Sequence, residues 1–261
     1  MASEKTIAIV TRLVEFSETS LIVTLMTKDF GKITAMAKGA RRHKSPFESA
    51  LDLLAECRIV FIKKSSGAMS LLTEAKLERR FRSSATSLNR LYAGYFVIEM
   101  INALTDEGDP HPDLFESAKN FICKIDSPNY ADSNLRLDLL KFEIELLISL
   151  GHKPMLGYCV GCGREKTEVS RVYFGLSDGG IYCSNCRRGK RNIVSLSGEG
   201  LQFLLALAGE KIGNHELQPL PLSSASPTHV GFEESWALVQ KYLTHLLGFP
   251  PKLAKFLKQL P

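Results

Sequence analysis

The sequence lacks the segments that would carry the chain into or across a membrane. No run approaches the ~20 consecutive apolar residues that a membrane-spanning helix needs, because Arg, Glu or Lys interrupts the longest apolar segments. The N-terminal segment MASEKTIAIV does not combine a positively charged lead with an apolar stretch and a small-residue cleavage site, so it is not a signal peptide. We therefore expect a cytoplasmic protein with no membrane partner.

The motifs of several common enzyme classes are also missing. The sequence contains no Gly-x-x-x-x-Gly-Lys-Ser/Thr nucleotide loop, no Gly-x-Gly-x-x-Gly, no His-Glu-x-x-His and no Gly-x-Ser-x-Gly. Its six histidines are isolated from one another, and the acidic residues of 106–113 are expected to punctuate and cap helices. The sequence therefore predicts a protein that is not an enzyme.

Charge is distributed unevenly along an otherwise ordinary globular composition. The 261 residues are 44% hydrophobic and 23% charged, which favours a packed core over general disorder. Residues 1–82 carry 15 Lys and Arg against 9 Asp and Glu, residues 83–156 carry 6 against 11, and residues 157–196 carry 7 against 3. A basic front, an acidic middle and a second basic segment are typical of a nucleic-acid binder whose other surface meets something else. Scattered solvated charges are the alternative.

Short apolar segments at the front of the chain predict a small β-barrel over residues 1–82. Between Thr6 and Lys76, five segments rich in Val, Ile and Thr are separated by turn signals such as Phe16-Ser17-Glu18 and Asp29-Phe30-Gly31. Five short strands are what a Greek-key barrel of the oligonucleotide/oligosaccharide-binding type, the OB-fold, requires. A small SH3-like barrel is the alternative.

The apolar period changes to that of helices near Ser83. We expect a helical domain made of residues 83–156 and 192–261. Its helices are expected over 87–104, 112–125, 134–150, 197–209 and 232–247, followed by a short basic helix opened by Pro250-Pro251. The Pro- and Ser-rich stretch 218–229 is expected to be a surface loop.

Four cysteines predict a metal site in an insert spanning residues 157–191. They form two Cys-x-x-Cys pairs, Cys159 with Cys162 and Cys183 with Cys186, and Asp178-Gly179-Gly180 is expected to turn a hairpin that brings the pairs together. Two such turns complete a tetrahedron of thiolates, which predicts a zinc ribbon. Four thiolates leave no open position for water, so the zinc would be structural. An iron–sulfur cluster is the alternative, and disulfides are disfavoured in a cytoplasmic chain.

The densest basic segment lies between two expected strands, at residues 38–44. Arginine contacts phosphate in a bidentate manner and lysine acts as a point charge, so such a loop can follow a nucleic-acid backbone without reading bases. A solvated loop without a ligand is the alternative, and a second basic cluster behind the last cysteine could reach DNA or balance the charge of a zinc tetrathiolate. The candidate DNA-binding residues are Lys38, Arg41, Arg42, Lys44, Lys63, Lys64, Arg79, Arg80, Arg187 and Arg188.

These elements, in this order, resemble the RecO family of bacterial recombinational-repair mediators. The resemblance spans nearly the whole chain, and the basic segment AKGARRHKS is its most specific piece. The other pieces are IAIVTRLVEFSETSLIVTLMTKDFGKI, LLISLGHKPMLGYCVGCG, GGIYCSNC and the closing KYLTHLLGFPPKLAKFLKQL. The PPKLAKFL ending departs from the more basic lead into the last helix that the resemblance implies, which weakens the case for DNA contacts there.

The resemblance implies an α+β multidomain protein: an N-terminal OB-fold barrel followed by an α-helical domain with an inserted four-cysteine zinc ribbon. It also implies binding of single- and double-stranded DNA, annealing of complementary strands, and association with the nucleoid. The implied partners are RecR, the C-terminal tail of single-stranded DNA-binding protein and, indirectly, RecA, which the assembly helps to load.

Two other functions remain open on the residues alone. The acidic helical middle could be the working surface of a protein-interaction scaffold, with DNA binding incidental. A nuclease would need acidic metal ligands beside the basic DNA-binding residues, and cleavage of labelled DNA in the presence of Mg²⁺ would reveal such an activity.

Overall fold

The computed structural model describes residues 3–43, 45, 47, 50–63, 69–165, 171–209, 230–257 and 260. The chain forms two compact units, Met1–Asp132 with Lys255–Lys258, and Ser133–Ala254 with Gln259–Pro261. This packing groups residues 83–132 with the barrel. The sequence predicts three domains, with boundaries at 82/83, 156/157 and 191/192. That division stays a prediction.

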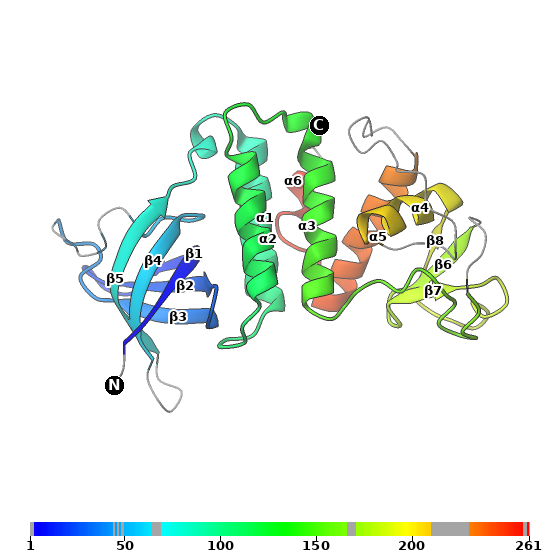
Figure 1. Ribbon diagram of the computed structural model, residues 1–261, viewed down its shortest axis with the longest axis horizontal. Coiled ribbons are helices and arrows are strands. Elements are labelled where there is room, and N and C mark those ends of the chain that lie inside the picture. Colours follow the sequence, from blue (N-terminus) through cyan, green and yellow to red (C-terminus); the bar gives the residue numbers. More distant parts are fainter. Residues whose placement is uncertain are drawn as a thin grey trace. The chain divides into compact units, whose positions relative to one another are not determined.

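The five predicted strands are confirmed and close into a barrel (Figure 1). They are β1 (Ser3–Glu15), β2 (Leu21–Thr27), β3 (Gly31–Ala37), β4 (Glu56–Ile62) and β5 (Ser70–Arg79). The strand order is β1-β2-β3-β5-β4, and β1 pairs with both β2 and β4. The pairing of β3 with β5 is parallel and the other pairings are antiparallel.

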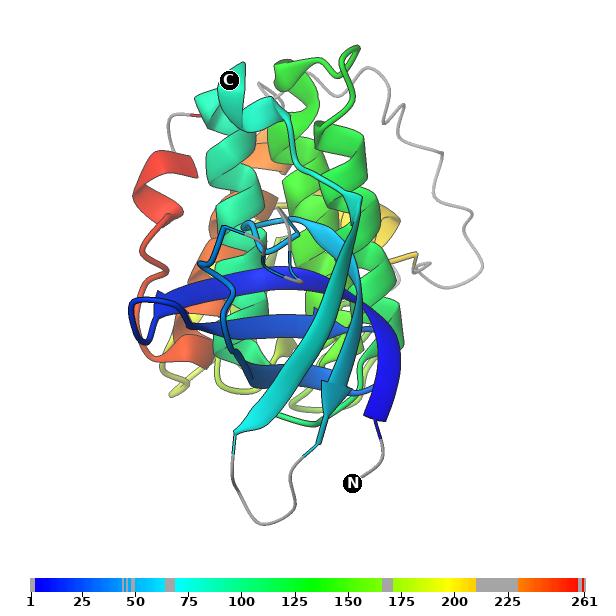
Figure 2. The same cartoon turned by 90° about the vertical axis from the view of Figure 1, so that its left-hand side faces the viewer.

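The long strand β1 closes the barrel because it bends. Its first part pairs with β4 and its last part with β2, and the register with β2 shifts between Val10 and Arg12. A bulge of this kind sharpens the local twist and bends a strand, and Figure 2 shows β1 curving across the barrel. Small and branched side chains such as Ala8, Val23 and Ala35 fill the interior and are fully buried.

Two helices complete the first unit close to their predicted spans. The turn η1 (Ser83–Ala85) leads into α1 (Leu88–Leu104), and α2 (Pro112–Ile125) follows with Pro112 in its first turn. The Ser87 hydroxyl accepts a hydrogen bond from the N–H of Arg90 and so caps α1.

The terminal helix begins later than predicted. It is α6 (Ala254–Leu257), and the residues after Pro251 form a turn in which Ala254 N–H donates to Pro251 O at 3.2 Å. The expected start at Pro250-Pro251 is wrong: Pro250 precedes a proline and is therefore disfavoured in the helical region, and residues 252 and 253 form a turn ahead of the helix. The ring of Phe256 stacks on Tyr92 of α1 with centroids 4.5 Å apart.

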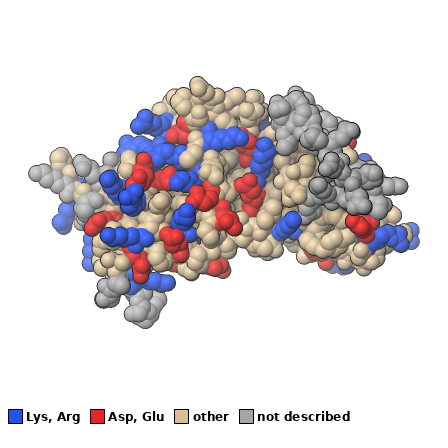
Figure 3. All heavy atoms as spheres, viewed as in Figure 1, with Lys and Arg blue, Asp and Glu red and all other residues tan. Residues whose placement is uncertain are grey.

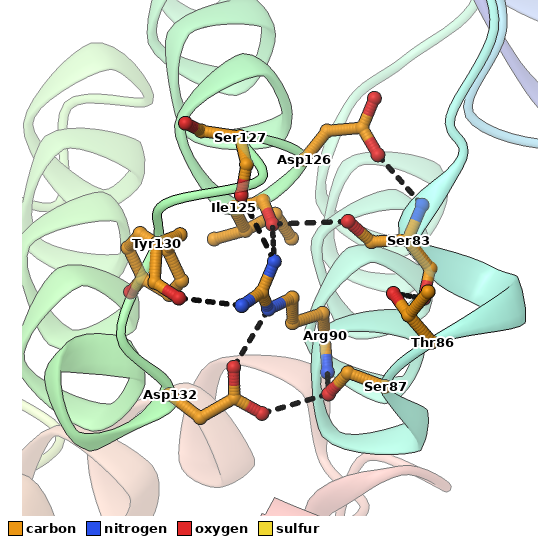
Figure 4. A network of polar contacts seen from close by, with 9 residues as sticks. All are labelled: Ser83, Thr86, Ser87, Arg90, Ile125, Asp126, Ser127, Tyr130 and Asp132. Carbon is orange, nitrogen blue, oxygen red and sulfur yellow. Dashed lines mark hydrogen bonds and ion pairs between the residues drawn. The ribbon is translucent and has the colours of Figure 1, made fainter.

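The side chain of Arg90 ties the start of α1 to the segment that follows α2 (Figure 4). Its guanidinium donates to Asp132 Oδ1 at 2.6 Å, to Ser127 O at 3.0 Å and to the carbonyls of Ile125 and Tyr130. Burial raises the pKa of Asp132, but hydrogen bonds from Arg90 and Ser87 outweigh it and hold that pKa below its usual value. One arginine thus satisfies the carbonyl of Ile125, the last residue of α2, and two carbonyls of the segment that follows.

The second unit combines helices with a small sheet. The turn η2 (Asp132–Asn134) leads into α3 (Leu135–Ser149), and α4 (Gly198–Leu207) and α5 (Val230–Leu247) follow later in the chain. Ser197 caps α4 by accepting from Gly200 N–H at 3.1 Å. The predicted loop over 218–229 lies outside the described residues.

The sheet has the strand order β7-β6-β8. Its strands are β6 (Val172–Gly175), β7 (Gly180–Tyr182) and β8 (Ile193–Leu196), all antiparallel. The hairpin predicted around Asp178-Gly179-Gly180 is confirmed as the β6–β7 turn. Among the described residues, none of the helices is long and apolar enough to span a bilayer.

Candidate metal centre and nucleic-acid interface

The four predicted cysteines lie together in the second unit. The sulfur atoms of Cys159, Cys162, Cys183 and Cys186 are all within 4.8 Å of one another. Each pair sits in a tight turn. In the first turn Gly163 N–H donates to Cys159 O at 2.8 Å, and in the second Arg187 N–H donates to Cys183 O at 3.2 Å. Four sulfurs this close could hold a metal ion.

The β6–β7 hairpin delivers the second pair to the first. Cys183 directly follows β7, and Val160 N–H donates to Ile181 O at 2.9 Å, which fixes the first turn beside that strand. The N–H of Cys183 also donates to the sulfur of Cys159 at 3.3 Å. A Cβ on Gly161 would lie 2.9 Å from the Cβ of Cys186, so the close approach of the turns needs a glycine there.

The local electrostatics favour the thiolate form of Cys159 and Cys183. Burial raises the pKa of the Cys159 thiol, but backbone hydrogen bonds from Cys183, Gly161 and Cys162 outweigh it and lower the pKa to about 6. A backbone hydrogen bond from Cys186 is the main cause that lowers the pKa of Cys183. The pKa of Cys186 is raised to about 12, first by its hydrogen bond with Cys183. Cysteine binds a metal as the thiolate, so the donors aimed at the sulfurs of Cys159 and Cys183 suit a metal.

The basic cluster behind the last cysteine is partly held on aromatic rings. The guanidinium of Arg187 lies 4.1 Å from the centre of the Tyr173 ring, and the Lys190 ammonium lies 5.0 Å from that of Tyr182. Cation–π contacts of this kind stabilise the charged groups where they are. Arg188 is exposed, and its side chain forms no ion pair with any residue that the structure describes.

In the first unit, the structure places Lys38, Arg41 and Arg42 together in one exposed turn after β3. Gly39 has a φ of +73°, and Arg42 N–H donates to its carbonyl at 3.1 Å. We call residues 38–43 the basic turn. Lys44, which was predicted to belong to it, lies outside the described residues.

Arg41 fastens the basic turn to the loop between β1 and β2. Its backbone N–H donates to Thr19 O at 3.0 Å, and its Nη1 donates to Glu15 Oε2 at 3.1 Å and to Ser17 O at 3.3 Å. Two segments that are distant in sequence therefore form one edge of the barrel.

The other residues of the first unit that were predicted to bind DNA, Lys63, Lys64, Arg79 and Arg80, differ in their surroundings. Lys63 and Arg80 are exposed, whereas Lys64 lies outside the described residues. Arg79 lies 3.7 Å from a carboxylate oxygen of Glu56, which also pairs with Lys119 of α2 at 2.6 Å. Arg79 thus helps to neutralise a buried carboxylate, and its role in DNA binding stays a prediction.

Figure 3 shows Lys and Arg interspersed with Asp and Glu over the first unit on the face drawn, rather than one unbroken basic field.

Sequence reasoning assigned Phe16 only to a turn and missed its exposure. The side chain is 57% exposed at the loop that Arg41 braces. The signal that could have found it is an aromatic residue between two strands and close in space to a basic segment.

The second unit also holds an open cavity of about 620 Å³. Polar and apolar groups contribute about equally to its lining. The lining residues are Arg171, Ser197, Gly198, Glu199, Gln202, Val230 and Glu234.

Comparison with known protein families accounts for both units. The family described as Recombination protein O N terminal matches residues 1–81, and Recombination protein O C terminal matches residues 85–254. The chain belongs to the RecO family.

Individual RecO proteins match over almost their full length. The chain is 40% identical to the DNA repair protein RecO of Rhodopirellula baltica, across 96% of this chain and 97% of the relative. It is 26% identical to that of Syntrophus aciditrophicus, across 99% and 96%, and 28% identical to that of Halalkalibacterium halodurans, across 97% and 93%. The RecO N-terminal match contains the barrel and the basic turn, and the RecO C-terminal match contains the four cysteines.

Proposed function

We propose that the chain is a non-catalytic DNA-binding protein of DNA repair and recombination. The observation that carries the proposal is the exposed basic turn, with Lys38, Arg41 and Arg42, fixed at one edge of a closed five-stranded barrel. The relatives named DNA repair protein RecO support the biological role. The barrel's strand order, with antiparallel neighbours and one parallel pair between β3 and β5, favours an OB-fold over an SH3-like barrel.

The mechanism is electrostatic. Cations of the basic turn neutralise phosphates of single- or double-stranded DNA and release counterions. When two complementary strands bind, the same neutralisation lowers the repulsion that opposes their meeting, which promotes annealing. In this role the protein acts in the nucleoid with RecR and the C-terminal tail of single-stranded DNA-binding protein, and helps to load RecA.

The metal of the second unit is structural zinc in this proposal, and the unit's three strands and two cysteine turns form a zinc ribbon. The four thiolates are the donor set that zinc prefers in closed sites. The ribbon stabilises its own unit, and its exposed Arg188 is a secondary DNA contact at most.

The test is the salt dependence of DNA binding by Arg41→Ala/Arg42→Ala. Each phosphate contact contributes close to one unit to the slope of log affinity against log salt. We expect weaker binding to every sequence and a slope that is shallower by roughly two units. An unchanged slope removes the basic turn from the interface.

A matched control removes the same charge elsewhere on the same barrel. Arg58 and Lys76 are exposed and face each other on β4 and β5, so Arg58→Ala/Lys76→Ala should leave the slope close to that of the unaltered protein. Incubation of labelled DNA with Mg²⁺ tests the absence of catalysis, because cleavage by a clean preparation would indicate a nuclease.

A further inference from the structure

We propose that Phe16 is a base-stacking residue, whose ring contacts bases of single-stranded DNA while the basic turn binds the phosphates. The inference rests on the proposed function and adds to it a contact that charge alone does not provide. Aromatic rings bind bases without regard to sequence, because every base has a π-face.

The exposure of Phe16 is not explained by the packing of the barrel. The ring is 57% exposed, whereas Phe47 and Phe61 are buried in the core. Phe30 packs edge-on against Phe61 with ring centroids 5.3 Å apart. The aromatic packing of the barrel core is thus made by phenylalanines other than Phe16. Single exposed hydrophobic residues are common on proteins, and Phe16 is set apart by the loop that holds its ring and by the cation beside it.

The loop that carries Phe16 is fixed by hydrogen bonds. The N–H of Phe16 donates to Ser20 O at 3.1 Å, and the N–H of Ser17 donates to the same carbonyl at 3.3 Å. The N–H of Ser20 donates back to the Ser17 hydroxyl at 3.2 Å. A ring presented by a preordered loop loses little conformational freedom on binding, which favours affinity.

The guanidinium of Arg41 is hydrogen-bonded to both residues that flank Phe16 in the sequence. The guanidinium of Arg41 donates to the carboxylate of Glu15 and to the carbonyl of Ser17, the two neighbours of Phe16. The loop therefore places an aromatic face and a phosphate-binding group at the same edge of the barrel, which is the combination found in single-strand binders.

This arrangement distinguishes single from double strands. In a duplex the faces of the bases are covered by their neighbours, so a stacking ring has access to bases only in single strands. Phe16 should thus contribute to single-strand affinity, while the basic turn contributes to both.

The experiment compares Phe16→Ala with the unaltered protein on an oligothymidylate and on a duplex of equal length. We expect single-strand affinity to fall roughly 5- to 150-fold, as for loss of one stacked base, with duplex affinity and the salt slope unchanged. Phe16→Trp should retain affinity and show tryptophan emission quenched by the oligonucleotide, because the native Trp236 is only 6% exposed. Phe249→Ala removes a ring that is 54% exposed in the second unit and is the matched control.

Two results would overturn the inference. One is full single-strand affinity in folded Phe16→Ala, and loss of RecR binding by that variant would then make Phe16 a protein contact. The other is equal loss on single and double strands with a shallower slope. Absence of DNA binding by the unaltered protein would instead overturn the proposed function itself.

Discussion

Nη1 of Arg41 lies 3.1 Å from Oε2 of Glu15, so a central cation of the basic turn is already paired with a carboxylate. The two side chains are 38% and 72% exposed. Exposed pairs of this kind are worth at most about 1 kcal/mol. The pair is therefore weak enough for a DNA phosphate to replace the carboxylate, yet it competes with that phosphate.

The first prediction removes the competitor. Glu15→Gln keeps the shape of the side chain and abolishes its charge, so the Arg41 guanidinium becomes more available to a phosphate. We expect DNA affinity to rise about two- to fivefold, the equivalent of up to about 1 kcal/mol, when binding is titrated at low salt. The gain should vanish in an Arg41→Ala background, and a gain that persists there would mean that Glu15 acts only through the overall charge.

The elements that the sequence predicts well are those with long, regular patterns. Five short Val- and Ile-rich segments, and helices such as α1 and α2, follow directly from apolar periodicity. The strand β8, Ile193–Leu196, was not predicted, because its four residues are too few to show a period and its place depends on pairing with β6. The late start of α6 was missed because turn residues and helix residues look alike over such a short stretch.

The cluster of four cysteines could be predicted from the sequence, whereas the contacts made by the arginine side chains could not. Cys-x-x-Cys spacing contains the geometry of its own turn, so the cluster of four sulfurs follows from local chemistry. The environments of Arg79 and Arg187 depend on long-range packing, against Glu56 in one unit and Tyr173 in the other. A count of basic residues cannot separate a cation that is held internally from one that is exposed.

The second prediction concerns loss of the metal. Cys159→Ser removes one thiolate, and we expect loss of bound zinc and a lower melting temperature, because metal binding contributes directly to folding of such sites. DNA affinity should fall only as far as the folded fraction falls. Zinc content, thermal melting and DNA titration of the same preparation check this, and Cys57→Ser, at a buried cysteine outside the cluster, controls for substitution of a thiol. A folded, zinc-free variant that no longer binds DNA would place the ribbon in the interface.

The third prediction concerns Arg90, whose side chain is 12% exposed. It donates hydrogen bonds to Asp132 and to three backbone carbonyls. Lysine retains the charge but lacks the planar fork, so Arg90→Lys leaves several acceptors without a donor. We expect a loss of about 2 kcal/mol in the free energy of unfolding, measured by denaturant titration. Arg58→Lys, at an exposed arginine of β4, should change stability little, and an equally small effect at Arg90 would show that water satisfies these carbonyls.

The last prediction concerns Glu143, a buried carboxylic acid in the second unit. Its Oε1 accepts a hydrogen bond from Gln240 Nε2 of α5 at 2.6 Å, while its Oε2 is buried and has no hydrogen-bond partner among the described residues. Burial raises the pKa of Glu143 to about 8, against a weaker lowering by Gln240. The acid is therefore mostly protonated at neutral pH.

A carboxyl group whose pKa is higher in the folded than in the unfolded state stabilises the fold most at low pH. Its contribution is complete below about pH 4.5 and is lost as pH rises towards 8. Glu143→Gln cannot ionise, so its melting temperature relative to the unaltered protein should increase steadily from pH 5 to pH 8. Glu145→Gln, at an exposed position of the same helix, should show no such trend. A difference that is constant across this range would mean that Glu143 stays charged in the fold and has an ionic partner.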